Sequence, residues 1–125
     1  MTTETNTKQF FKTHEWIVDL GDGKYRMGVS QYACDQLGDI VFVEEQDAGS
    51  TIDEGSSLAI LESVKAVGDI YAPVDAEIVA TNPAAVAEPE SISGETWIVE
   101  IKTSNSLTNL DLLPEAAYQD YLQTL

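Results

Sequence analysis

The feature that most constrains the fold is a series of short apolar runs, which glycine, proline and acidic residues interrupt. The runs are shorter than a typical core helix, and several alternate apolar and polar residues as half-buried strands do. They predict one mostly-β domain over residues 9–125, after a disordered tail over residues 1–8, built as a sandwich or flattened barrel. The predicted strands cover residues 15–20, 24–29, 39–45, 57–61, 70–72, 77–80 and 96–102.

Alternation within these runs predicts two opposite faces for each strand. In the first run, Trp16, Val18 and Leu20 are expected on one face. In the run 39–45, the period of two places Ile40 with Phe42 on one face of the strand. In the last run, the side chains expected to share a face are Trp97, Val99 and Ile101.

Two helices are predicted where capping residues flank a suitable run. Ser30 can cap a short helix over residues 31–36, and Gly38 can end it. Pro114 fits the first position of a C-terminal helix over about residues 114–123, where its missing N–H costs nothing. The stripe expected to pack this helix on the sheets comprises Leu113, Ala117, Tyr121 and Leu125.

Composition narrows the range of functions. With 22 acidic and 6 basic residues the net charge is −16, which disfavours nucleic-acid binding. The acids can serve docking onto basic rims of partner enzymes or simply solubility. No apolar run reaches the roughly 18 residues of a membrane span, and the N-terminus lacks the features of a signal or transit peptide. Cys34 and His14 are the single cysteine and histidine, so we expect no disulfide, no metal site and no catalytic residues.

Lys65 is prominent because it lies between two strand-like runs. Residues 57–61 and 70–72 flank a short polar break, which predicts a hairpin with Lys65 near its tip. The break lacks the Asn-Gly or Asp-Gly pair of the tightest turns. Such a lysine is either an ordinary surface residue or an attachment point, because its amine can form an amide with a carboxylic acid.

Several segments form recognisable motifs when taken together. Residues 62–66 are Glu-Ser-Val-Lys-Ala and residues 69–74 are Asp-Ile-Tyr-Ala-Pro-Val. With Thr13–Trp16, Gly28–Ala33 and Leu37–Glu44, they resemble the glycine cleavage system H proteins over most of the chain. The resemblance implies a barrel-sandwich hybrid, the lipoyl/biotinyl-like fold of two antiparallel sheets with a short internal helix and a C-terminal helix. It also implies a non-catalytic carrier with lipoate in amide linkage to Lys65.

The resemblance further implies a shuttle within a multienzyme system. The lipoyl group would take an aminomethyl unit from glycine decarboxylase (P protein) to an aminomethyltransferase (T protein), and dihydrolipoyl dehydrogenase (L protein) would reoxidise the dithiol. A lipoate ligase or lipoyl/octanoyl transferase would attach the group, reading Glu62 near the lysine. Thr13, Glu15 and Asp69 would line a cleft that shields the loaded arm, with Glu15 able to neutralise an ammonium.

One departure from the family pattern leaves other interpretations open. The loop over residues 90–97 is shortened, lacks a Pro-Tyr pair and has Thr96 in place of a glycine. An H-like paralogue that relays lipoate to other lipoyl-dependent complexes, or an unmodified interaction module, would also fit. A biotin carrier is disfavoured, because Val64 and Ala66 flank Lys65 where methionines are usual. We expect a monomer in the bacterial cytoplasm, with a mature mitochondrial protein as the alternative.

Overall fold

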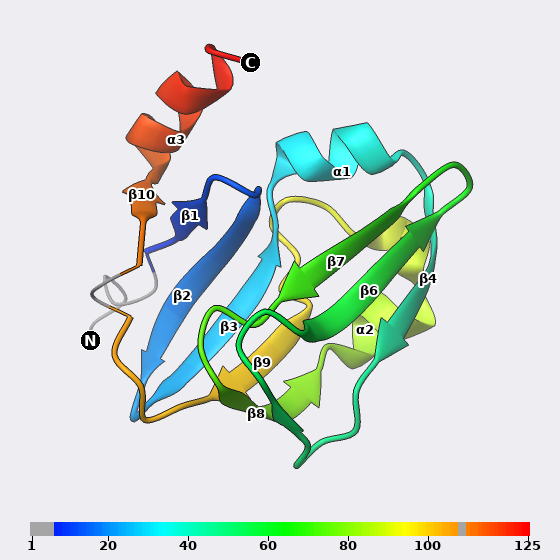
Figure 1. Cartoon of the computed structure of the whole chain (residues 1–125). Helices are drawn as coiled ribbons and strands as arrows, with labels where there is room; N and C mark the ends of the chain where they lie inside the picture. The colour runs from blue at the N-terminus through cyan, green and yellow to red at the C-terminus, as the bar shows by residue number, and fades with distance from the viewer. Residues whose placement is uncertain (1–6, 108–109) are drawn as a thin grey trace.

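Two antiparallel sheets packed face to face form the body of the molecule (Figure 1). The structure, a computed structural model, describes residues 7–107 and 110–125. In spatial order, the larger sheet contains β10 (Leu112–Pro114), β1 (Gln9–Phe11), β2 (Glu15–Gly21), β3 (Lys24–Val29), β9 (Val99–Lys102), β8 (Ala76–Thr81) and β5 (Thr51–Ile52). The smaller sheet contains β4 (Ile40–Glu45), β6 (Ser57–Ser63) and β7 (Val67–Tyr71). The predicted mostly-β sandwich is confirmed, and within the described residues the two sheets do not close into one barrel.

Both predicted helices are present, and their ends follow the capping residues. α1 (Gln31–Leu37) begins after Ser30, whose hydroxyl oxygen accepts a hydrogen bond from the Ala33 amide at 3.1 Å. It ends at Gly38, whose φ of 80° suits glycine. α3 (Glu115–Leu122) follows β10 and lies against the outer side of β1 (Figure 1).

The connection from β8 to β9 contains more structure than the sequence predicts for this acid- and alanine-rich segment, a surface loop or a weak helical turn. It contains α2 (Pro83–Ala87) and the 3-10 helix η2 (Pro89–Ser91). Ala85 is fully buried, and both helices contact β4, so they cover one open end of the sandwich. In the described part of the chain, no helix is long and apolar enough to cross a bilayer.

The main core lies between the two sheets, and a second cluster holds α3. Core side chains with at most 1% exposure include Met27, Leu58, Leu61, Ile70, Ile78, Ile98, Val99 and Ile101. Full burial of one such side chain contributes about 1.5–3 kcal/mol. The second cluster contains Trp16 and Val18 together with Phe10 and Tyr118, whose rings stack with centroids 4.5 Å apart. Leu20 shares the predicted face with Trp16 and Val18 but is 38% exposed and lies outside the cluster.

In β4 the predicted alternation is wrong after the first residue. A β-bulge shifts the register with β6 between Ile40 and Phe42. Ile40 and Val43 therefore both point into the core, at 4% and 2% exposure, whereas Phe42 is 51% exposed on the outer face. A bulge adds a residue to one strand and re-aims the side chains that follow it. The apolar pattern carries no sign of that extra residue.

The strand before the C-terminal segment also begins later than predicted. β9 starts at Val99, and its alternation does not extend back to Trp97. Val99 and Ile101 join Ile98 in the main core, whereas Trp97 packs against the cluster that holds α3. The predicted common face of Trp97 with Val99 and Ile101 is therefore wrong.

The two chain ends differ from prediction in their anchoring residues. Pro114 is the N-cap residue of α3, and the buried contact of that helix is Tyr118, which lies outside the predicted stripe. Of the stripe, Leu113 and Tyr121 pack against the same cluster, whereas Leu125 is 62% exposed. Of the tail predicted over residues 1–8, residues 1–6 lie outside the described residues. Lys8 is fixed by two hydrogen bonds, described below, and so belongs to the ordered domain.

Thr81→Val should raise the free energy of unfolding by about 1 kcal/mol. Thr81 is 8% exposed, and its hydroxyl has no hydrogen-bond partner within the described residues. Replacing the hydroxyl by a methyl group therefore removes an unsatisfied polar group at nearly constant shape. Thr103→Val is the matched control, because the Thr103 hydroxyl donates a hydrogen bond to the Asp75 carbonyl. Loss of that hydrogen bond should lower the free energy of unfolding by a similar amount. Urea titration measures both, and destabilisation by Thr81→Val would contradict the expectation.

Candidate functional site

The β6–β7 hairpin presents Lys65 at its tip, and the hairpin projects beside α1 (Figure 1). Glu62 and Val67 form the last cross-strand pair. The Ser63 hydroxyl closes the turn: it accepts hydrogen bonds from the amides of Ala66 (2.9 Å) and Lys65 (3.3 Å). These hydrogen bonds stabilise the turn, which lacks the Asn-Gly or Asp-Gly pair of the tightest turns. Lys65 is exposed, and no carboxylate of the described residues forms an ion pair with its ammonium.

The C-terminal end of α1 packs against the hairpin. A Cβ at Gly68 would lie 3.3 Å from the Leu37 side chain, so the absence of a side chain lets helix and strand approach closely. A Cβ at Gly38 would lie 3.3 Å from Cε of Lys65, so the lysine stem passes over the helix cap. The attachment atom therefore extends from a rigid mount into solvent.

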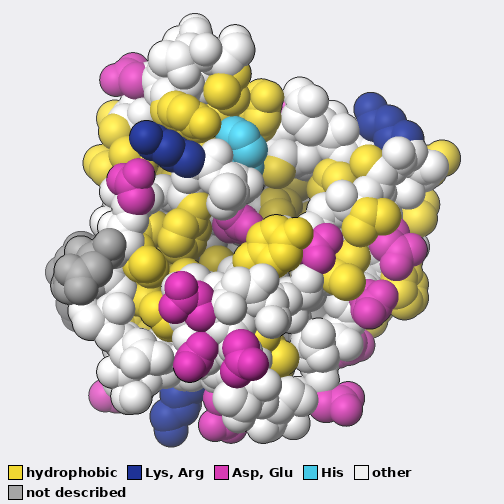
Figure 2. Space-filling view, viewed as in Figure 1, with side chains coloured by type: hydrophobic (Ala, Val, Ile, Leu, Met, Phe, Trp, Pro, Cys, Tyr) yellow, Lys and Arg dark blue, Asp and Glu magenta, His cyan; other side chains and the backbone are white. Residues whose placement is uncertain are grey.

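A line of outward side chains leads along β7 from the hairpin to a small cleft. Val67, Asp69 and Tyr71 are every second residue of β7, so their side chains point to the same side of the strand. At about 3.3 Å per residue, Val67 and Tyr71 lie about 13 Å apart. The cleft, of about 160 Å³, is lined by Phe11, Thr13, Glu15, Tyr71, Ala72 and Pro73. Figure 2 shows a hollow at the centre of this face, lined by hydrophobic side chains with acidic ones at its margin.

Glu15 is the buried carboxylate of this cleft. It is 5% exposed and accepts hydrogen bonds from the Thr13 hydroxyl and from the amides of Glu15 and Tyr71. Burial raises the pKa of the carboxyl above its usual value, and these hydrogen bonds oppose that shift. No basic side chain in the described ranges pairs with it. The arrangement suits a small cation that enters the cleft.

A hydrogen-bonded network fixes the backbone between the two polar cleft residues. His14, between Thr13 and Glu15, has a φ of 82°, which is uncommon outside glycine. Its Nδ1 lies 2.7 Å from the Tyr118 hydroxyl, which donates a hydrogen bond to Ser30 Oγ at 2.7 Å. Burial lowers the pKa of His14, so the neutral ring is favoured at pH 7. α3 thereby holds the turn that places Thr13 and Glu15 side by side.

Tyr118→Phe should lower the free energy of unfolding by about 1–2 kcal/mol, because it removes the buried hydrogen bond to Ser30 and leaves the half-buried His14 nitrogen without its partner. Stacking on Phe10 is retained, so the change isolates the hydroxyl. Tyr121→Phe, on the same helix but only half-buried, is the control and should change stability by less than about 0.5 kcal/mol. Urea titration that gives equal values for the two variants would contradict this role of the network.

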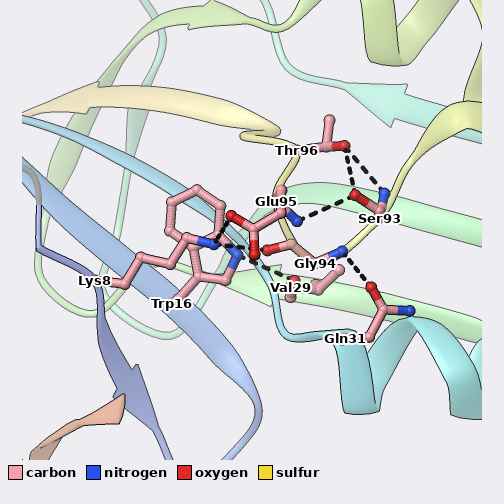
Figure 3. Close-up of polar contacts among 8 residues, drawn as sticks. All are labelled: Lys8, Trp16, Val29, Gln31, Ser93, Gly94, Glu95 and Thr96. Atoms are coloured by element: carbon pink, nitrogen blue, oxygen red, sulfur yellow. Dashed lines mark hydrogen bonds and ion pairs between the residues drawn. The ribbon is translucent and has the colours of Figure 1, made fainter.

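The loop that departs from the family pattern has a defined course (Figure 3). The Lys8 ammonium forms an ion pair with Glu95 and a hydrogen bond to the Gly94 carbonyl, both at 2.9 Å, and lies over the Trp16 ring. The Gly94 amide donates to the Gln31 side chain at the start of α1 at 2.9 Å. These contacts connect the loop to the N-terminal segment, β2 and α1.

Cys34 has no nucleophilic role in this environment. It lies on α1 and is 8% exposed. Burial, and secondarily the charge of Asp35, raise the pKa of the thiol to about 11. The thiolate is the reactive form, so this group is unreactive near pH 7. Within the described residues no cluster of His, Cys, Asp and Glu could hold a metal ion.

The remaining predicted site residues lie outside the cleft. Asp69 lies on β7 between Lys65 and the cleft, and its carboxylate accepts a hydrogen bond from Ser57 Oγ at 2.5 Å. Glu62 lies on β6, one residue before the turn. The structure thus brings Thr13 and Glu15 together, with Asp69 on the approach to them.

Sequence reasoning missed three residues that shape the site. Tyr71 lines the cleft, and its position two residues after Asp69 on a strand was a usable signal. Ser63 closes the lysine turn, and serine at the start of a turn was a second signal. Tyr118 reaches the cleft residues from the other end of the sequence, for which no local signal exists.

A β-sandwich that holds an exposed lysine on a supported hairpin, beside a cleft with one buried carboxylate, defines a cofactor-carrier domain. The protein supplies the anchor and the shelter, and other proteins supply catalysis. The model of the glycine cleavage H-protein family matches residues 8–125, and the chain belongs to this family. H proteins are the lipoyl carrier subunits of the glycine cleavage system and are not themselves catalytic.

Relatives from distant organisms cover nearly the whole chain. The glycine cleavage system H protein of Cronobacter sakazakii is 41% identical over 127 aligned positions, which cover 98% of each chain. A probable mitochondrial H protein of Dictyostelium discoideum is 39% identical and covers 92% of this chain and 82% of its own. The crystal structure of the Mycobacterium marinum H protein superposes with a TM-score of 0.80 at 30% identity, covering 94% of this chain and 98% of that one.

Proposed function

We propose that the Lys65 amine carries a lipoyl group in amide linkage and that the protein shuttles aminomethyl units within the glycine cleavage system. The observation that supports this most is an exposed amine on a supported hairpin, with no acidic partner among the described residues. A buried or ion-paired amine could not enter the active site of an attaching enzyme. The exposed ammonium also loses little hydration when it reacts.

The cleft lies within reach of an arm anchored at Lys65. When bound, the lipoyl dithiolane supplies the disulfide that accepts a one-carbon unit. The lysine stem and lipoyl chain contain on the order of ten rotatable bonds of about 1.5 Å each, so they extend up to roughly 13–15 Å. This reach matches the length of β7, at whose far end Tyr71 lines the cleft. Glu15 and Thr13 would accept hydrogen bonds from an ammonium there, and the apolar walls would limit access of water.

The proposed partners are those of the glycine cleavage cycle. Glycine decarboxylase loads the arm, the aminomethyltransferase unloads it, and dihydrolipoyl dehydrogenase reoxidises the dithiol. A lipoate ligase or a lipoyl/octanoyl transferase attaches the group, with Glu62 beside the turn as its recognition residue. Asp69 would guide the arm along β7. We place the monomeric protein in the bacterial cytoplasm, with the mitochondrion as the alternative.

The loop over residues 90–97 supports one second candidate, a relay that passes lipoate to other lipoyl-dependent complexes. An exchange assay separates the two functions. Lipoylated protein is mixed with glycine decarboxylase, glycine and labelled bicarbonate, and incorporation of label into glycine is followed. We expect stimulation that saturates with carrier concentration. Full lipoylation without any stimulation would exclude the shuttle and favour the relay, whereas absence of lipoylation would favour an unmodified interaction module.

A further inference from the structure

Exposed large hydrophobic side chains gather around Lys65. Within the described ranges, most of them lie on β4, the β6–β7 turn or β7, at 49–79% exposure: Val41, Phe42, Val64, Val67 and Tyr71. Contiguous exposed apolar side chains mark interaction sites on soluble proteins. Figure 2 shows hydrophobic and acidic side chains next to one another over the β6–β7 part of this surface. The clustering therefore indicates a surface that binds another protein.

The outer face of the smaller sheet arranges these groups in two rows. Strand pairing aligns Phe42 with Glu62 and Val67, and in the next row Glu44 with Ile60 and Asp69. Neighbouring strands lie about 4.8 Å apart, so every apolar side chain has a carboxylate beside it. We call these six residues the docking face. The bulge in β4 is what turns Phe42 outward into it.

The charge of the docking face is negative and depends on modification of Lys65. Glu44 and Glu62 form no ion pair with a basic side chain of the described residues. Lys65 supplies a positive charge at the edge of the face. Amide formation at its amine removes that charge, so the modified protein presents the acids without this compensation. A basic partner surface therefore favours the modified form over the unmodified one.

We propose that the docking face binds partner enzymes whose arm-accepting entrance carries an apolar strip edged by Lys and Arg, with Phe42 as the apolar anchor. The inference rests on the proposed function, because an arm of roughly 13–15 Å requires close approach to the hairpin. Charge complementarity selects this occupant: a basic edge would pair with Glu44 and Glu62 and speed the encounter. Two copies of a chain with a net charge of −16 would repel each other.

The test compares Phe42→Ser with Leu20→Ser in the lipoylated full-length protein. Leu20, 38% exposed on β2, lies outside the docking face and is the matched control. With glycine decarboxylase in the exchange reaction, KM for the Phe42→Ser carrier should rise about tenfold with kcat within about twofold, as loss of an interface anchor requires. Leu20→Ser should match wild type. Val67→Ser, expected to raise KM about threefold, decides the question should Phe42→Ser fold poorly.

The dependence of KM on ionic strength tests the electrostatic part of the proposal. Raising ionic strength from about 0.05 to 0.3 M should raise the wild-type KM, and less so for the double variant Glu44→Gln/Glu62→Gln. Equal KM values for wild type, Phe42→Ser and Val67→Ser would overturn the inference, as would self-association that Phe42→Ser abolishes. Should lipoylated wild type support no exchange, the proposed function fails instead. The variants are then compared in lipoate attachment, where a tenfold lower kcat/KM supports the docking face and an unchanged value overturns it.

Discussion

Lys65→Arg abolishes attachment of lipoate and leaves the fold unchanged. Arginine keeps the positive charge and the exposed position, but its guanidinium stays protonated and cannot form the amide. After co-expression with a lipoate ligase in medium containing lipoate, the intact mass of the variant should equal that of the unmodified chain. Wild type should gain the mass of one lipoyl group. The variant should consequently support no exchange of bicarbonate into glycine.

The control for this prediction is Lys24→Arg, which alters another exposed lysine, on β3. It should be lipoylated as fully as wild type and support the same exchange rate. Urea titration of both variants should give free energies of unfolding within about 0.5 kcal/mol of wild type, as surface substitutions usually do. Modification of the Lys65→Arg protein would show that the hairpin lysine is not the anchor.

Glu15→Gln shortens the lifetime of the aminomethyl-loaded protein roughly 10- to 100-fold. A charge-assisted hydrogen bond to an ammonium contributes about 1.5–3 kcal/mol, and the amide keeps the shape without the charge. The loaded protein is prepared with glycine and glycine decarboxylase, and its breakdown is followed as formaldehyde release. Glu77→Gln, an exposed substitution on β8 outside both the cleft and the docking face, should leave the lifetime unchanged. Equal lifetimes for wild type and Glu15→Gln would show that the Glu15 carboxylate does not protect the aminomethyl group.

The protective effect of Glu15 should depend on pH in one direction. Because burial raises the pKa of this carboxyl, it gains a proton at a higher pH than an ordinary glutamate does. Protection should thus be full above the raised pKa and decline as pH falls through it, whereas the Glu15→Gln protein should lack this step. An NMR titration of the Glu15 side chain in the unloaded protein locates the midpoint. A midpoint at or below the usual glutamate value would contradict the burial argument.

Features set by neighbouring residues could be predicted from the sequence. The helix α1 follows from Ser30 at its start and Gly38 at its end, which act through hydrogen bonds and backbone geometry a few residues long. The Lys65 hairpin follows from two apolar runs around a polar break. In each case the determinants lie close together in the sequence, so no knowledge of the tertiary fold is needed.

Features that depend on distant residues could not be predicted in this way. His14 and Tyr118 are 104 positions apart, and nothing near either residue indicates their hydrogen bond. The bulge that turns Phe42 outward depends on how β4 pairs with β6, which strand periodicity does not encode. The cleft combines residues 11–15 with residues 71–73, so it forms only when β7 packs beside the start of β2.

The central claim is that the amine of Lys65 anchors the swinging arm. The most direct test is fragmentation mass spectrometry of wild-type protein purified after co-expression with a lipoate ligase. The predicted result is one lipoyl group per chain, located on Lys65, with Lys8, Lys12, Lys24 and Lys102 unmodified. A chain that remains unmodified, or that carries the group on another lysine, would contradict the claim.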